Sequence, residues 1–97
     1  MPTYIALLNW TQRGAEQVQS SPNRLDAARE IFKTMGAEIK DVYMTMGRYD
    51  LVCVIGAPDD ATFAKAMLTL GSKGTTHSES LKAFSEDEYR KIIGSLS

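Results

Sequence analysis

Two five-residue runs, at positions 4–8 and 51–55, are apolar or aromatic throughout, and they limit the folds that this chain can adopt. A strand with one solvated face alternates apolar and polar residues, whereas a strand that is apolar on both faces is covered on both sides. We therefore expect these runs to form the central strands of a sheet, with more polar strands at its edges.

The other elements follow from helix and strand signals. Residues 39–46 and 75–83 are predicted to be polar edge strands, with Ile39 and Val42 on opposite faces of the first. A helix is expected from Ser21 as its N-cap, and Gly36 ends it as a left-handed C′ residue. A second helix follows Pro58, with Asp59 or Asp60 as its cap, and ends at Gly71. Last, residues 85–88 have the Ser-x-x-Glu form of a capping box and predict a C-terminal helix.

The predicted order βαββαβ is that of the ferredoxin-like α+β sandwich, whose antiparallel sheet has the strand order 4-1-3-2. This order places the two apolar runs in the centre, as their composition requires. A length of 97 residues and a hydrophobic content of 43% fit one globular domain over residues 1–97.

Charge and hydropathy exclude several classes of partner. The net charge is −1, and no cluster of Lys or Arg interleaves with aromatic residues, so nucleic acid is not an expected partner. The longest apolar run, 51–57, is too short to cross a membrane, and the N-terminus lacks the pattern of a signal peptide. We therefore expect a cytoplasmic protein without a membrane partner.

Cys53 is the only cysteine and His77 the only histidine. No intrachain disulfide is possible, and a transition-metal site rich in His or Cys is excluded. We predict no metal and no cofactor.

The polar turn at 45–50, between two predicted strands, combines glycine, arginine, a phenol and a carboxylate. The topology brings this turn to the same pole as the end of the first strand and the start of the last. The predicted ligand-binding residues at this pole are Asn9, Trp10, Thr11, Arg48, Tyr49 and Asp50.

Each of these residues has a functional and a structural interpretation. Asp50 is either a base or hydrogen-bond acceptor for a ligand, or a turn residue that accepts backbone N–H groups while Gly47 supplies a positive φ. Its structural ion-pair partner would be Arg13 or Arg24. Arg48 is either a carboxylate clamp or a solvated charge, and Tyr49 is a candidate donor.

Trp10 either walls a pocket or fills an interface, Asn9 offers donor and acceptor groups, and Thr11 either binds a ligand or caps a short helical turn. Asp50 and His77 are the candidates for acid–base catalysis.

The residues at 45–50 also resemble the glycine-tyrosine-aspartate signature of the GYD domain family. The similarity extends to residues 7–11, 21–29 and 57–60, and so covers nearly the whole chain. The resemblance implies a small ferredoxin-like domain, related to dimeric α/β-barrel proteins, and it implies no particular reaction.

In a ferredoxin-like fold the helices cover one face of the sheet, so the second apolar face of the central strands needs another cover. Either a second copy packs on it, which makes a homodimer or higher homo-oligomer, or the C-terminal helix folds over it. We expect the homodimer.

Three functions are compatible with these features. The first is a homo-oligomeric module that binds a small organic ligand without converting it, and we favour this one. The second is a cofactor-free monooxygenase or isomerase of the dimeric α/β-barrel type. The third is a subunit that serves assembly alone, and the fold by itself does not choose among them.

Overall fold

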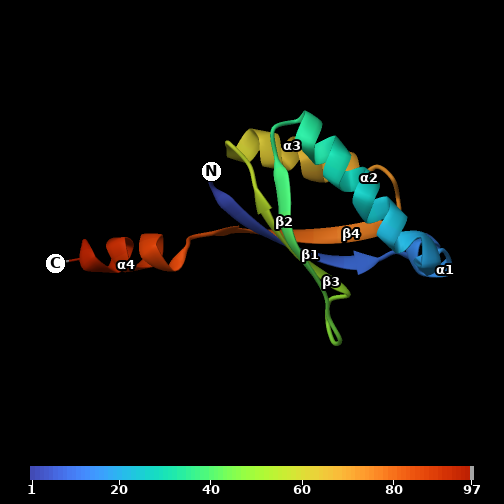
Figure 1. The fold of residues 1–97 in the computed structure, drawn as a ribbon. Helices are drawn as coiled ribbons and strands as arrows, with labels where there is room; N and C mark the ends of the chain where they lie inside the picture. The colour runs from blue at the N-terminus through green and yellow to red at the C-terminus, as the bar shows by residue number, and fades with distance from the viewer. Residues whose placement is uncertain (97) are drawn as a thin grey trace.

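The computed structural model describes residues 1–96 and contains a four-stranded sheet with helices on one face (Figure 1). The elements, in chain order, are β1 (Thr3–Trp10), α1 (Gln12–Glu16), the 3₁₀ helix η1 (Val18–Ser20), α2 (Ser21–Thr34), β2 (Glu38–Met44), β3 (Leu51–Gly56), α3 (Asp60–Gly71), β4 (Thr76–Ala83) and α4 (Glu86–Gly94). The sheet order is β2-β3-β1-β4 with every neighbouring pair antiparallel. This confirms the ferredoxin-like α+β fold and its order 4-1-3-2.

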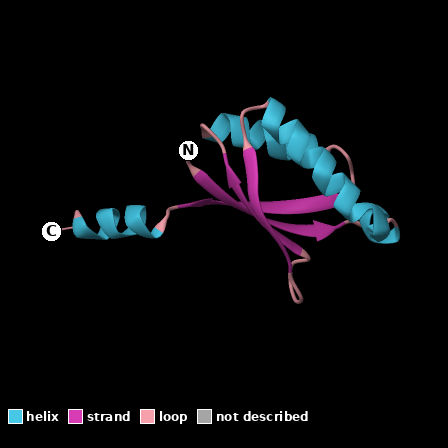
Figure 2. Ribbon diagram, viewed as in Figure 1, coloured by secondary structure: helices cyan, strands magenta, loops and turns pink. Residues whose placement is uncertain are grey.

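The core lies between the sheet and the helices α2 and α3, which cover the same face (Figure 2). Alternate residues of β1 face this core, and they are almost fully buried. Phe32 of α2 is 1% exposed and Ile55 of β3 is 2% exposed. The largest buried side chains therefore come from both layers of the sandwich, and they hold α2 against the sheet.

Local signals explain where the helices end. Gly36, with φ of +83°, follows α2 as the predicted left-handed residue. The Asp59 carboxylate accepts the Thr62 N–H at 2.7 Å and caps α3. The predicted N-cap of α2 is shifted by one residue, because Ser21 is already helical and Ser20 precedes it without a side-chain cap bond.

The predicted faces of β2 are wrong at Ile39. A register shift between Ile39 and Asp41 places both Ile39 and Val42 opposite core-facing residues of β3, namely Ile55 and Cys53. A β-bulge adds one residue to a strand and reverses its alternation, so a strict period of two cannot hold across it. The strand also ends at Met44, two residues before its predicted end.

Helix α4 forms as predicted and lies apart from the sandwich. Ser85 and Glu88 make both hydrogen bonds of the capping box, at 3.1 and 2.9 Å. Figure 1 shows the helix projecting beyond the end of β4, and none of its residues is buried. The C-terminal helix therefore does not cover the open face of the sheet within one chain.

Candidate functional site

The predicted pole exists, because the turn between β2 and β3 lies beside the end of β1. Thr45 N–H donates to the carbonyl oxygen of Asp50 at 2.8 Å and closes the turn. Gly47 has a φ of +131°, which confirms the predicted need for glycine. In the β1–β4 pairing, Asn9 lies opposite His77.

Asp50 connects β3 to β1. One oxygen of its carboxylate accepts the backbone N–H of Trp10 at 3.0 Å. Its own N–H donates to the Leu8 carbonyl at 2.9 Å and to the Asn9 side-chain oxygen at 3.1 Å. Asp50 thus accepts a backbone N–H as one prediction had it, but that N–H belongs to a distant strand rather than to the turn.

The predicted ion-pair partners of Asp50 lie elsewhere. Arg24 donates to the carbonyl oxygens of Gln17 at 2.8 Å and of Gly14 at 3.3 Å. Among residues 1–96, neither Arg13 nor Arg24 forms a salt bridge with Asp50. That structural interpretation is wrong, because both arginines belong to the helical side of the pole.

Tyr49 lies on the side of the sheet that faces away from the helices. Its hydroxyl donates to the Glu79 carboxylate at 2.9 Å, and this hydrogen bond is the main reason that the pKa of Tyr49 is raised. Glu79 lies on β4 opposite Leu7, so the pair lies at the uncovered face of the sheet. Arg48 and His77 are both exposed.

Thr11 has the capping role that the sequence allowed. Its hydroxyl accepts the Gly14 N–H at 3.2 Å and donates to the Gly74 carbonyl at 2.7 Å. A Cβ on Gly14 would lie 2.1 Å from the Thr75 carbonyl oxygen, so this contact requires glycine. These interactions hold α1 against the loop between α3 and β4.

Trp10 faces the helices, not the turn. It lines a cavity of about 60 Å³ between the sheet and α2, together with residues such as Leu25 and Phe32. Its Nε1 is buried and has no hydrogen-bond partner among residues 1–96. Of the predicted pole residues, Trp10 is the one that lines this cavity.

The sequence model of the GYD domain family matches residues 4–93. This chain belongs to the GYD domain family. A relative from Thermus thermophilus, named glutamine synthetase and cystathionine beta-lyase binding protein, is 38% identical over 84 residues, which are 86% of this chain and 88% of the relative.

Two solved structures share the fold of this GYD domain. The crystal structure of MtbAldR superposes with a TM-score of 0.69 at 13% identity, over 88% of this chain and 54% of that one. This domain thus spans about half the length of that protein. A crystal structure of a Thermus thermophilus protein superposes with a TM-score of 0.55 at 24% identity, over 88% of this chain and 95% of that one.

The predicted pole residues of this GYD domain are therefore divided between the two faces of the sheet. Asp50 supports the end of β1, from which Trp10 reaches the covered side, while Tyr49 and Glu79 lie at the open side.

No helix within residues 1–96 has both the length and the apolarity to span a bilayer. Over the same residues, no three His, Cys, Asp or Glu side chains cluster as metal ligands do.

Sequence reasoning missed three cations beside the Trp10 cavity. Arg13, Arg24 and Lys73 line a groove of about 270 Å³ between α2 and the end of α3. They come from three separate segments, and only the packing of α1 against the loop before β4 brings them together. The sequence holds no spacing that would have indicated this cluster.

Proposed function

We propose that this GYD domain is a self-associating, non-catalytic binding module in which a second copy covers the open face of the sheet. The observation that carries the proposal is this uncovered apolar face. Its residues alternate with the buried ones along β1 and β3, and Leu81 of β4 adds to them. They are Ile5, Leu7, Val52, Val54 and Leu81, which we call the open-face cluster.

The exposed surface of the chain has the size that such an assembly needs. Its accessible surface is 6599 Å², whereas a compact monomer of this mass exposes about 5,500 Å². The excess of about 1,100 Å² exceeds the ~800 Å² that each partner buries in an interface of standard size. A radius of gyration of 14.6 Å, against about 12.5 Å for a compact chain of this length, supports the same conclusion.

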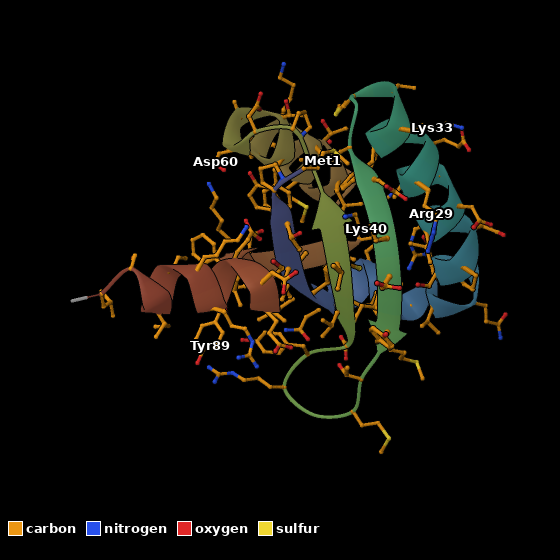
Figure 3. All side chains as sticks on the ribbon, turned by 60° about the vertical axis from the view of Figure 1, so that its left-hand side comes forward. Met1, Arg29, Lys33, Lys40, Asp60 and Tyr89 are labelled. Atoms are coloured by element: carbon orange, nitrogen blue, oxygen red, sulfur yellow. The ribbon has the colours of Figure 1, made fainter. Side chains whose placement is uncertain are left out.

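Helix α4 supplies part of this excess. Its apolar residues Tyr89, Ile92 and Ile93 lie at helical spacing on one side, and each is more than 40% exposed. Figure 3 shows Tyr89 on α4, pointing away from the helices that cover the sheet. In a twofold assembly, the same α4 surface of each copy is available to pack on the other.

The relationship to the Thermus protein supports a protein partner for the assembled module. That relative is named for binding glutamine synthetase and cystathionine beta-lyase. By this likeness, we propose that the present domain also binds another protein rather than converting a substrate. The Asp50 carboxylate already accepts the Trp10 N–H, which favours binding over the monooxygenase or isomerase alternative.

A small organic ligand at the pole of Asn9, Thr11 and Asp50 is the second candidate. The exposed guanidinium of Arg48, next to Tyr49 in the turn, favours it. A carboxylate ligand there would be held by Arg48, and His77, which lies opposite Asn9 on β4, borders the same pole.

Light scattering of the eluting protein tests self-association. At micromolar concentration we expect at least twice the chain mass of 10.7 kDa. Leu7→Lys should give the single-chain mass with an unchanged circular dichroism spectrum, because Leu7 lies in the open-face cluster. Leu68→Lys is the matched control, since Leu68 of α3 is 76% exposed and lies outside that cluster.

A wild-type protein that elutes at the single-chain mass contradicts the proposed self-association.

The protein partner is tested separately. Glutamine synthetase and cystathionine beta-lyase from the organism that encodes this chain are immobilised, and binding of the wild-type domain to each is measured. Saturable binding to either supports the partner, and binding to neither removes it without affecting the measured oligomeric state.

A further inference from the structure

The space between the sheet, α2 and the end of α3 has two adjoining parts. The inner part is the Trp10 cavity of about 60 Å³, and the outer part is the groove of about 270 Å³. They share Arg24, Ala28, Phe32, Leu70 and Thr75 as walls. The groove lies just below the range of 300–1,000 Å³ that is usual for small-molecule sites, so its occupant would be small.

The charge of the groove is of one sign. Arg13, Arg24 and Lys73 line it, and the described residues that line either part include no Asp or Glu. Within residues 1–96, none of these cations has a carboxylate at salt-bridge distance. Positive groups that converge without a protein counter-ion match an anionic ligand.

Arg24 is held in place for such a ligand. Two of its N–H groups donate to the carbonyls of Gln17 and Gly14, which belong to the first helical segment and its C-cap. A guanidinium has five N–H donors, so three remain for an anion. Arg13 lies near the loop between α3 and β4, which carries Lys73. A Cβ placed on Gly74 of that loop would be 3.7 Å from the Nη1 atom of Arg13.

The interior has the opposite character and a single free donor. Leu25, Phe32 and Leu70 provide an apolar wall, and the Trp10 Nε1–H is buried without a partner among the described residues. A buried donor without an acceptor is costly and is normally satisfied by water or by a ligand. The apolar wall suits the apolar body of a ligand. The Trp10 Nε1–H needs an acceptor of its own, which a bound water beside that body would supply.

We infer that this space, separate from the open-face cluster and from the Asp50 turn, binds a small carboxylate with a short apolar tail. The carboxylate lies among Arg13, Arg24 and Lys73, and the tail enters between α2 and the sheet. A free ammonium group on the ligand is disfavoured, because it would face three cations. The ligand class is therefore a simple hydrophobic acid rather than an amino acid.

Trp10 is the only tryptophan and provides the signal for a test. Hexanoate is titrated into the full chain while Trp10 fluorescence is recorded, and acetate, hexanol and norleucine are titrated in parallel. We expect a saturable change with hexanoate, and binding at least tenfold weaker for each of the other three. Equal binding of hexanol or norleucine, or no saturable response to hexanoate, overturns the inference.

Variants test the location of the site. Arg13→Met and Lys73→Met should each weaken hexanoate binding about tenfold, as the loss of one charge-assisted hydrogen bond predicts. Lys33→Met is the matched control, since Lys33 is an exposed cation near the other end of α2 and its loss should leave hexanoate binding unchanged. Arg24 is left intact, because its bonds to backbone carbonyls also support the fold.

A second kind of variant tests the location of the site by adding a negative charge instead of removing a cation. Ala27 is exposed and lines only the outer groove, so Ala27→Glu should fold normally and add a negative charge beside the cations. We expect it to reduce hexanoate affinity more than tenfold. Wild-type affinity in Ala27→Glu and in both cation variants would show that hexanoate binds elsewhere and would refute the site.

Discussion

The two faces of the sheet are built from the same strands and differ in how far their side chains are buried. Along β1, Tyr4, Ala6 and Leu8 are at most 4% exposed, whereas the alternating Ile5 and Leu7 are only partly covered. Both sets are apolar, so hydrophobicity alone does not separate them. The difference arises because α2 and α3 pack on one face, and no described segment of the chain packs on the other.

The apolar surface of the sheet is thus divided between folding and association. The covered face contributes to the stability of a single chain, because its apolar surface is removed from water when the chain folds. The open face contributes only when something docks on it. We therefore expect mutations on the two faces to differ in which measurement they change.

The largest expected effect is on the covered face. Phe32→Ala removes a ring that is 1% exposed, and it should lower the free energy of unfolding by about 3–5 kcal/mol. Leu7→Ala on the open face should change the unfolding of a dilute, dissociated chain by less than ~1 kcal/mol. Urea denaturation at nanomolar and at high micromolar protein concentration measures both.

The dependence of the urea midpoint on protein concentration separates the effects of Phe32→Ala and Leu7→Ala further. The midpoint of the wild type should rise with protein concentration, because association stabilises the folded form, and Leu7→Ala should lose part of this rise. If Leu7→Ala costs as much as Phe32→Ala in the dilute chain, the two faces are equivalent in folding and the comparison fails.

An intermediate effect is expected at Asp50, which joins the strands where the two faces meet. Asp50→Ala leaves the Trp10 N–H without its acceptor, and the free energy of unfolding should fall by about 1–3 kcal/mol. Asp50→Asn keeps an acceptor oxygen and should cost less. Arg48→Ala, in the same turn but exposed, should change stability by no more than ~0.5 kcal/mol.

Thermal unfolding of these three variants tests the ranking. A loss of stability in Asp50→Ala that is no larger than that of Arg48→Ala would mean that the carboxylate does not support β1. Such an unchanged stability would then favour a ligand contact for Asp50.

The smallest expected effect is a pH dependence at the edge of the covered face. The Tyr4 hydroxyl donates to the Asp60 carboxylate, and Lys82 Nζ lies 3.0 Å from the same carboxylate. The hydrogen bond from Tyr4 is the main cause that lowers the pKa of Asp60, and the bond from Lys82 adds to it. The hydrogen bond to Asp60 also raises the pKa of Tyr4 to about 12.

The direction of each shift defines a pH window. The lowered Asp60 pKa stabilises the folded state above the unfolded value near pH 4, and this contribution is lost as pH falls through the lower folded pKa. The raised Tyr4 pKa stabilises the folded state below about pH 10, and this contribution is lost as pH rises toward 12.

Tyr4→Phe tests both windows, because it removes the hydroxyl and keeps a ring to stack on Phe63. In the wild type the centroids of these two rings are 4.1 Å apart. Melting temperatures of the variant should depend less on pH than those of the wild type in both windows. An unchanged pH dependence would show that the Tyr4–Asp60 hydrogen bond does not stabilise the fold. The effect is small because Asp60 is exposed, with 68% of its side chain accessible.

The elements that the sequence predicted well depend on local signals. Gly36 after α2, the Asp59 cap of α3 and the Ser85–Glu88 capping box are each set within a few residues, and each is present. Two long apolar runs were enough to identify the central strands. The bulge in β2 escaped prediction, because an inserted residue has no signature in an imperfectly alternating strand.

The site was predicted less completely than the fold. Strand order alone brought Asn9, Asp50 and His77 to one pole, but it did not show that Asp50 bonds to the backbone of Trp10. It also did not show that Arg13 and Lys73 converge beside the Trp10 cavity. Such contacts depend on how helices pack on the sheet, and sequence spacing does not encode the distance between separate segments.

The sequence by itself determined the topology, the central strands, the helix ends and the presence of apolar residues on both faces of the sheet. Those features follow from side-chain periodicity and backbone preference, which act over a few neighbouring residues. Only the tertiary structure decided that α4 leaves one face of the sheet open, that Trp10 points to the covered side, and that Arg13 and Lys73 converge beside it. These outcomes depend on packing between distant segments, where burial and steric fit select one arrangement from several that the local pattern allows.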